Sequence, residues 1–445
     1  MKLDETTSPV KLAIPIFIEL LLFMFMGNVD TIMLSRYSDL AVAAVGNANQ
    51  LTNTLLILFN ITSSATGIMV TQYIGASKRE NLNKIYTMGY GMNLILAVCL
   101  GALFMLFQPQ FFNLVNMPKE LFTDAKAYLS VIMTFLFIPA FFSLSSIILK
   151  SHGITKLSMY LAIMMNVVNI IGNYTFLFGP FGLPVLGVKG VAISTVVSRG
   201  LAVFIMIWVL IKKVDVKVSL AFLRPFPKQI YKQFLKLGIP SAGEPISYQF
   251  SQVVIFSMIN TMGTETVTTK IYVQIIVWFT FLASSALAQA NQIIVGQLVG
   301  AKREDEAKHL TFSTFKKALM ITFSVSLLFI LLRNQLLGIF SDNQSIIQLG
   351  ALILTIDIFV ELGRVSNLVI ISALKAAGDV NFPVIVGIFS MWLVSTLLAY
   401  ILGIVLGLGL LGIWIAMAAD EVLRGIIMIF RLKSNKWKGK RIVSE

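Results

Sequence analysis

The chain is poor in the residues that metal and redox sites need. Its 445 residues include one cysteine and two histidines, Cys99, His152 and His309. A single cysteine excludes disulfides within the chain and zinc or iron–sulfur centres built on several thiolates. Cys99 lies in an apolar run, where a buried or lipid-facing thiol is expected. Both histidines fall in expected cytoplasmic loops, so we expect them to be solvated and predict no metal site.

Catalytic motifs are also missing. The sequence has no phosphate-binding Walker loop, no HExxH helix, no nucleophile elbow and no paired Asp-rich motifs of a prenyl transferase. We therefore expect a protein that is not an enzyme and that uses no cofactor. Without ATP hydrolysis in this chain, uphill work would draw on a gradient of protons or sodium ions.

Charge is scarce along the whole chain. Charged residues make up 13% of it and hydrophobic residues 57%, whereas a soluble domain carries about a quarter charged residues. Many apolar runs exceed the roughly 18 residues that suffice to cross a bilayer. The first run, residues 10–34, is too long for the core of a signal peptide, so we interpret it as a span. The composition predicts an all-α integral membrane protein.

We predict twelve transmembrane helices with both termini cytoplasmic. The expected spans are 9–35, 40–74, 85–107, 122–148, 156–179, 186–212, 233–262, 266–299, 310–333, 345–373, 381–406 and 410–432. Of the 35 lysines and arginines, only Arg36, Lys119, Lys126 and Arg333 fall in external segments. Because positively charged loops stay inside, this bias sets the orientation in a cell inner (cytoplasmic) membrane. The net charge of +14 therefore reflects topology and the lipid bilayer, and we expect no nucleic-acid partner.

The second half of the sequence repeats the first at a constant offset. Ile14-Pro15 returns 225 residues later as Ile239-Pro240, and Glu19 returns as Glu244. The segments 70–76, 149–153 and 199–200 return in the same register at 295–301, 374–378 and 424–425. Six spans per half enter the membrane from the same side, so an axis along the membrane normal should relate the two halves.

The repeat predicts two pseudo-symmetric six-helix bundles. The amino-terminal lobe covers residues 1–218 and the carboxy-terminal lobe residues 219–445, with a cytoplasmic linker at about 212–232. Duplicated bundles carry their substrate site near the bilayer midplane at the interface of the repeats. Pro15 and Pro240 interrupt the first helix of each lobe, and we predict that these helices bend there.

Asp30 is the first ionisable group inside a span. Such groups are costly in a membrane and mark either function or a paired network. A carboxylate that faces a partly hydrated cavity can bind a proton or a sodium ion. The structural alternative is a carboxylate that only hydrogen-bonds to a neighbouring helix.

Candidate partners of Asp30 lie in spans 5 and 6. Asn166, Asn169 and Asn173 recur at helical spacing and share one face, and Thr195 gives span 6 a polar side. Their oxygens suit sodium and can equally hydrogen-bond to a protonated acid. The alternative is that they only join helices. Arg199 is expected to neutralise an acid that the sequence does not identify.

A second charged cluster lies in the carboxy-terminal half. Asp357, Glu361 and Arg364 share one face of span 10 at i, i+4 and i+7, and Glu361 and Arg364 could neutralise each other. With Glu244 on span 7, these acids could hold a cationic substrate or a second coupling ion. The alternative is a closed ion-pair network in which Lys270 and Arg364 consume the acids.

Charges on span 12 and at the inner end of span 1 are interpreted more simply. Asp420 and Arg424 stand four residues apart and suit an intrahelical ion pair. Glu421 beside them is interpreted as structural too. Glu19, the repeat mate of Glu244, is expected to contact the linker or to line an inner cavity.

The motifs together resemble the MATE family, the multidrug and toxic compound extrusion transporters of bacterial type. Pro15 followed by VDT at 29–31 is similar to the first span of the family, and VTQYIGA at 70–76, with its repeat at 295–301, to the loops after spans 2 and 8. The run from Asn169 to Ala192 resembles spans 5 and 6. The similarity covers essentially the whole chain.

This resemblance implies an antiporter that exports organic cations and other small-molecule drugs by alternating access, as a monomer, in exchange for H⁺ or Na⁺. By position, Asp30, Asn169, Asn173 and Thr195 would form a cation-coupling site in the amino-terminal lobe. Bending of span 1 at Pro15 would accompany protonation of Asp30.

The resemblance also bears on the carboxy-terminal lobe. Where family members have a site there, their acids fall near Tyr248 and Arg364 of this chain, so Glu244 with Asp357 or Glu361 would be an alternative arrangement. The competing function is a flippase for lipid-linked oligosaccharide or cell-wall precursors. A flippase would favour a strongly cationic cavity for diphosphate, whereas the embedded charges here are mixed.

Overall fold

The computed structural model describes residues 8–114 and 117–443, and within these ranges it contains helices and no strand. The α-helices are α1 Pro9–Ser35, α2 Asp39–Gly75, α3 Leu82–Leu106, α4 Gln108–Leu114, α5 Phe122–Thr134, α6 Phe137–Ser151, α7 Thr155–Phe178, α8 Gly187–Val209, α9 Lys228–Asn260, α10 Thr264–Gly300, α11 Glu304–Leu331, α12 Arg333–Gly338, α13 Gln344–Ala376, α14 Asn381–Ser390, α15 Leu397–Ala399 and α16 Gly409–Lys433. Shorter or wider helical turns are η1 Arg79–Asn81, η2 Lys119–Leu121, η3 Pro180–Gly182, η4 Leu210–Val214, η5 Leu220–Leu223, η6 Met391–Thr396 and η7 Tyr400–Val405.

The helices account for the predicted spans. Among the described residues, nine helices are long and apolar enough to cross a membrane, and α5 with α6 would form a tenth span. The other long helices are α9, which contains Pro240 and Pro245, and α16. With these two, each of the twelve predicted spans has a helical counterpart, and the prediction of an all-α membrane fold is confirmed.

The fourth predicted span is bent rather than continuous. It was expected to run unbroken over 122–148, but α5 and α6 meet at an angle of 50°. Pro139 lies in the first turn of α6, and because proline has no backbone N–H it cannot bond to the carbonyl of Phe135. The amide of Ile138 instead donates to that carbonyl at 2.9 Å.

The chain folds into two compact units whose division crosses three helices. The first unit holds residues 18–70 and 78–238, and the second holds residues 8–17, 71–77 and 239–443. Helix α1 therefore changes unit between Phe17 and Ile18, shortly after Pro15, and α9 changes unit between Gly238 and Ile239, shortly before Pro240. The proposed lobe boundary at 218/219 stays a prediction, but both proline helices begin in the unit opposite to the one that holds most of their length.

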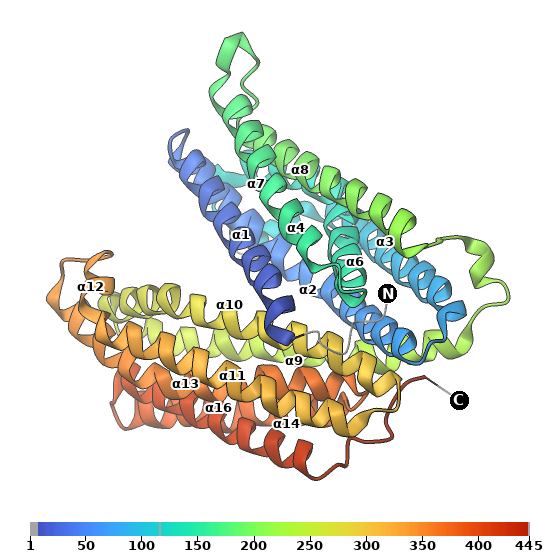
Figure 1. The fold of residues 1–445 in the computed structure, drawn as a ribbon. Helices are drawn as coiled ribbons and strands as arrows, with labels where there is room; N and C mark the ends of the chain where they lie inside the picture. The colour runs from blue at the N-terminus through green and yellow to red at the C-terminus, as the bar shows by residue number, and fades with distance from the viewer. Residues whose placement is uncertain (1–7, 115–116, 444–445) are drawn as a thin grey trace. The chain divides into compact units, whose positions relative to one another are not determined.

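Helix α8 organises the first unit. It packs along α7 and against α5 and α6, and α7 and α8 run side by side in Figure 1. Small and branched side chains such as Ala44, Ala125, Val191 and Ala192 are fully buried in this core. Small residues allow helix backbones to approach closely, which is how helices associate where lipid replaces water.

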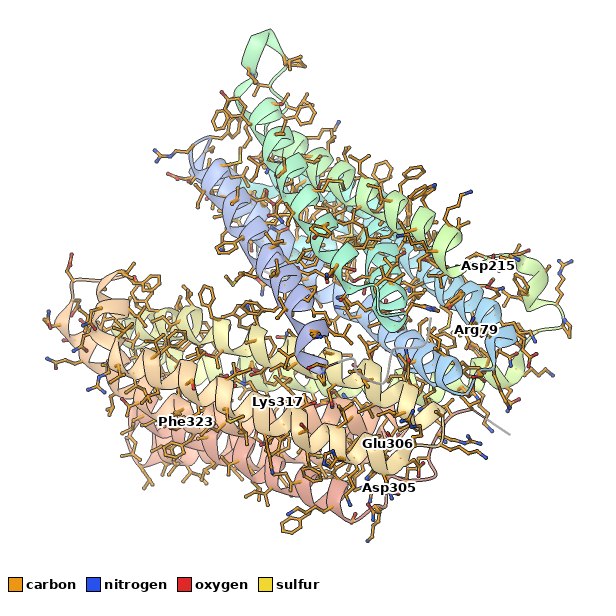
Figure 2. The ribbon with its side chains drawn as sticks, viewed as in Figure 1. Arg79, Asp215, Asp305, Glu306, Lys317 and Phe323 are labelled. Atoms are coloured by element: carbon orange, nitrogen blue, oxygen red, sulfur yellow. The ribbon has the colours of Figure 1, made fainter. Side chains whose placement is uncertain are left out.

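Helix α13 has the corresponding place in the second unit. It packs against α16, α10 and α11 (Figure 1), and its Ile353 and Val360 are fully buried beside Ile413 and Trp414 of α16. Figure 2 shows Asp305 and Glu306 at the start of α11, with Lys317 and Phe323 farther along the same helix. Acidic side chains in a first turn favour the positive end of the helix dipole.

The ends of α2 and α10 cross with backbone contact inside the second unit. A Cβ atom at Gly75 would lie 2.0 Å from the carbonyl oxygen of Gln297, and one at Gly300 would lie 2.1 Å from that of Gln72. Gly75 and Gly300 are repeat mates, as are Gln72 and Gln297, so the crossing is symmetric. Only glycine, which has no Cβ atom, fits at these two positions.

Replacing Gly300 by alanine should therefore destabilise the protein. The added methyl group forces the crossing helices apart, and overpacking of this kind costs about 1–3 kcal/mol. Thermal unfolding in detergent should show a lower midpoint for Gly300→Ala than for the wild type. Gly91→Ala is the control, because a Cβ at Gly91 meets nothing within 4 Å; equal midpoints for the two variants would contradict the prediction.

Candidate functional site

Asp30 lies at one end of a polar network in the first unit. Its side chain is 8% exposed, and its Oδ1 accepts a hydrogen bond of 2.5 Å from Nδ2 of Asn173. The same amide group lies 3.3 Å from Oδ1 of Asn169, whose own amide donates to Oγ1 of Thr195 at 3.3 Å. The four residues that the sequence grouped as a site therefore form one connected chain across α1, α7 and α8.

Helix packing holds this network in place. Ser194 donates to the backbone carbonyl of Asn169 at 2.9 Å, and Thr195 donates to that of Val191 at 3.0 Å. A Cβ at Gly172 would lie 2.2 Å from Oγ of Ser194, so glycine is required where α7 meets α8. This close approach places the asparagine face of α7 directly against the polar side of α8.

One oxygen atom of the network is available as a further hydrogen-bond acceptor. Oδ1 of Asn173 is buried and has no hydrogen-bond partner among the described residues. A buried carbonyl oxygen without a donor is costly. Oxygens of Asp30, Asn169, Asn173 and Thr195 are the type that ligates sodium, and the free oxygen of Asn173 could equally accept from a protonated carboxyl group.

Asn166, the third asparagine on this face, does not join the chain of side-chain bonds. Its amide donates to the carbonyl of Leu22 on α1 at 3.2 Å and to that of Ala162 at 2.9 Å. It therefore ties α7 to α1, as the packing alternative expected.

Two ion pairs, one buried and one half-buried, occupy equivalent places in the two halves of the sequence. Lys150 Nζ lies 2.9 Å from Glu19 Oε2, and Lys375 Nζ lies 2.5 Å from Glu244 Oε2. Both the glutamates and the lysines are repeat mates, and each glutamate follows its proline by four residues. Glu19 thus pairs with α6 rather than with the linker, and Glu244 pairs with a lysine that the sequence analysis had not considered as its partner.

Five other charged residues of the second unit, on α13 and α16, form a separate network. Arg364 pairs with Glu361 and lies 3.7 Å from Glu421, and Arg424 lies 3.3 Å from Asp420 and 2.9 Å from Glu421. The ion pairs expected between Glu361 and Arg364 and between Asp420 and Arg424 are therefore present. Glu244 does not join this network.

The other proposed residues of the second unit have separate environments. Asp357 accepts a hydrogen bond of 2.9 Å from the indole of Trp414. The Lys270 ammonium lies 4.8 Å from the ring centre of Phe256 and makes no ion pair with an acid within residues 8–114 and 117–443. Tyr248 lines a cavity of about 10 Å³ together with Arg364, Asp420 and Glu421, which is about the space of one water molecule.

His152 is not solvated, contrary to its expected loop position. It lies one residue beyond α6 with 6% of its side chain exposed, and its Nε2 is 2.8 Å from the hydroxyl of Tyr86. Burial, with a contribution from Arg79, lowers the pKa of His152 to about 3. Cys99 is exposed on α3 within an apolar span, as a lipid-facing thiol would be.

Removing one charge of a buried pair should be worse than removing both. Lys150→Met leaves Glu19, which is 2% exposed, without its countercharge, and such losses cost about 3–5 kcal/mol. The double variant Glu19→Gln with Lys150→Met should recover most of that stability. Thermal unfolding of the two single variants and the double variant checks this, and additive losses would show that the pair does not interact.

The helical fold and its buried charges define a class of protein. Two repeated helical bundles with buried charges inside their spans are characteristic of a secondary membrane transporter. The MatE family matches the chain twice, over residues 15–175 and 240–401. The chain belongs to the MATE family of membrane transporters. The two matches begin at Pro15 and Pro240, in the register of the internal repeat.

Similar proteins span the full length of the chain. An uncharacterized transporter of Bacillus subtilis, YisQ, is 39% identical over 434 residues, which cover 98% of this chain and 95% of that protein. A probable multidrug resistance protein NorM of Thermotoga maritima is 25% identical over 439 residues, which cover 98% of this chain and 94% of that protein.

Solved structures share the fold. A crystal structure of MATE in the bent conformation superposes with a TM-score of 0.87 at 21% identity, covering 96% of this chain and 95% of the other. An outward-facing structure of a multidrug resistance MATE family transporter also gives 0.87 at 21% identity, covering 98% of this chain and all of the other.

Proposed function

We propose that the protein is a multidrug efflux antiporter that exchanges organic cations and amphipathic drugs for H⁺ or Na⁺ by alternating access. The observation that carries the proposal is the buried network that begins at Asp30, an acid inside a span that accepts a hydrogen bond from the amide of Asn173 but makes no ion pair among the described residues. Membership of the MATE family and the similarity to a probable multidrug resistance protein support it.

Asp30 is the coupling group of this antiporter. In its ionised form it accepts from Asn173 and attracts a cationic drug. A proton on the carboxyl group, or a sodium ion held by it with the oxygens of Asn173, Asn169 and Thr195, cancels that attraction, so drug and ion compete for one negative charge. The free oxygen of Asn173 can ligate the sodium ion or accept a hydrogen bond from the protonated carboxyl group of Asp30.

The internal repeat indicates that coupling belongs to one lobe. The repeat mates of Asp30, Asn169 and Asn173 are Ile255, Val394 and Leu398. The Glu–Lys pairs, by contrast, are present in both halves. A function carried by Asp30 is therefore specific to the amino-terminal lobe, while the duplicated pairs serve both lobes alike.

Asp30→Asn should abolish ion-driven efflux while leaving the protein folded in the membrane. The amide keeps the size of the side chain but cannot bind a proton or hold a full negative charge. Dye efflux from proteoliposomes measures the loss, with Asp39→Asn, an exposed acid near the same end of the chain, as control. Unchanged efflux by the Asp30 variant would remove the coupling assignment.

The coupling ion is identified by imposing one gradient at a time on the same proteoliposomes. Efflux driven by a proton gradient alone, or by a sodium gradient alone, assigns the ion. A lack of efflux under both the proton gradient and the sodium gradient would contradict antiport. Accumulation of an undecaprenyl-linked precursor in a deletion strain would favour the flippase instead.

The proposed orientation places both termini in the cytoplasm. Replacing Cys99, the only cysteine, by serine gives a background for single cysteines at Asp342 and Lys436, which are both exposed. A membrane-impermeant thiol reagent applied to intact cells should label Asp342→Cys at once and Lys436→Cys only after permeabilisation. The reverse pattern would invert the topology.

A further inference from the structure

The linker at residues 212–232 is strongly basic and also exposes apolar side chains. It contains six lysines and arginines and a single acid, Asp215. All six basic residues are exposed, and so are Val218, Leu220 and Phe226, with Leu220 at 74%. Water solvates the basic side chains, but it does not stabilise large apolar side chains that stand between them. Basic and apolar residues in alternation are typical of segments that lie on a membrane surface.

Hydrogen bonds hold the linker against α3. The backbone amide of Lys217 donates to Oδ1 of Asn83 at 3.0 Å, and that of Ser219 donates to Oγ1 of Thr87 at 3.3 Å. The short helix η5, which follows directly, packs against α3. The linker therefore has a fixed place beside the start of a helix that is long and apolar enough to cross a membrane.

The length of α3 places this contact near the membrane surface. Figure 2 shows Arg79, just before α3, at the same end of the first unit as Asp215 of the linker. Helix α3 has 25 residues, which is about 37 Å at the helical rise, whereas the hydrocarbon core of a bilayer is about 30 Å thick. The boundary between headgroups and hydrocarbon therefore falls within the first turns of α3. Thr87 lies about 8 Å along the helix, so the bond to Ser219 holds Leu220 at about this level.

The internal repeat supplies a comparison for the start of the linker. Residues 434–443, which form the tail after the last helix, are the repeat mates of residues 209–218. The tail packs onto the second unit, where Trp437 is 2% exposed and its indole donates to a backbone carbonyl of α16 at 3.0 Å. The Lys438 ammonium lies 2.5 Å from Asp305 of α11. In the second half, the protein itself thus supplies partners for the equivalent segment.

The linker does not have such partners. Lys213 and Glu80 are the repeat mates of that lysine and that aspartate, but they make no ion pair with each other in residues 8–114 and 117–443. Of the six basic residues, only Lys217 lies within ion-pair distance of an acid in this part of the chain, 3.5 Å from Asp215, and both side chains are mostly exposed. An exposed pair of this kind contributes little. The positive charge of the linker is therefore available to a partner outside the protein.

We propose that the linker is a docking surface for anionic lipid headgroups of the cytoplasmic leaflet. Its lysines and its arginine bind the lipid phosphates, while Leu220 and Phe226 enter the edge of the hydrocarbon layer. Lysine and arginine are suitable donors for phosphate oxygens, and a cluster of about four to eight basic residues directly beside a span is typical of segments that bind acidic lipid. The inference goes beyond the proposed efflux function and does not depend on it.

A fluorescent label on the linker tests this proposal. In the Cys99→Ser background, Leu220→Cys is labelled with the environment-sensitive dye NBD, and the full chain is reconstituted in phosphatidylcholine. Spin-labelled phosphatidylglycerol, which is anionic, or spin-labelled phosphatidylcholine, which is neutral overall, is included at a series of mole fractions, and the quenching of NBD is measured. The mole fraction that halves the emission should be roughly 5-fold lower for phosphatidylglycerol, because basic residues near the surface attract the anionic lipid.

Two variants that lose the same number of charges separate the linker from the tail. Each is made in the labelled protein and replaces three basic residues by glutamine. The linker variant, which should lose the preference for phosphatidylglycerol, carries Lys213→Gln, Arg224→Gln and Lys228→Gln. The matched tail variant, which should keep the preference, carries Lys433→Gln, Lys436→Gln and Lys438→Gln.

High salt provides a second test that needs no charge variant. In about 1 M potassium chloride the Debye length is about 3 Å, so the unsubstituted linker should also lose its preference for phosphatidylglycerol. This measurement replaces the linker variant if that variant does not insert into the membrane.

A preference for phosphatidylglycerol that disappears in the linker variant or at high salt, and remains in the tail variant, supports the docking surface. Equal quenching by both lipids with the unsubstituted linker overturns it, as does an equal loss of preference in both variants. Emission typical of water with no quenching by either lipid overturns it too. No gradient is applied and no substrate is moved, so these outcomes are independent of the proposed antiport.

Discussion

The structure depends on one constraint. A charge inside an apolar helical bundle needs a counterion or a hydrogen-bond partner, which either the protein or a bound substrate must supply. In the second unit, Glu361, Arg364, Asp420, Glu421 and Arg424 form a continuous network of ion pairs, while Asp357 has the neutral indole of Trp414 as its hydrogen-bond donor. In the first unit, Glu19 pairs with a lysine, whereas Asp30 accepts from the neutral amide of Asn173 and Arg199 makes no ion pair among the described residues. Charged groups that make no ion pair within the protein are those that can respond to an ion or a substrate.

The duplication gives each half a reference against which the other can be compared. Features kept in both halves, namely the prolines, the Glu–Lys pairs and the glycines of the α2–α10 crossing, concern how helices bend and pack. Features present once, namely Asp30 with its asparagines and the acids beside Arg424, concern charge. The two halves thus share the helical framework but differ in electrostatics, and the proposed coupling follows from that difference.

The two helices that contain the repeated prolines, α1 and α9, each belong partly to both units. Helices α1 and α9 begin in one unit and continue in the other, and each changes unit beside its proline. The ion pair four residues later fixes the rest of the helix to α6 or α13. Since proline removes one backbone hydrogen bond, bending is cheapest at this junction. Helix α1 also carries Asp30, fifteen residues after its proline.

Local sequence features were sufficient to predict the helices, the repeat and the membrane class, because long apolar runs admit only helices and a constant offset needs no structure to be seen. Helical spacing also placed Asn169 and Asn173 on one face as candidate partners of Asp30, and the resemblance to the MATE family implied the group of four. The bend at Pro139 was missed although the proline was visible, and the Glu–Lys pairs were missed although both partners recur in the repeat. Only the tertiary structure decided that His152 is buried, that Trp414 donates to Asp357, and that Arg199 makes no ion pair among the described residues. Those outcomes depend on which helices pack together, and contacts between residues 57 or 66 positions apart leave no mark on local spacing.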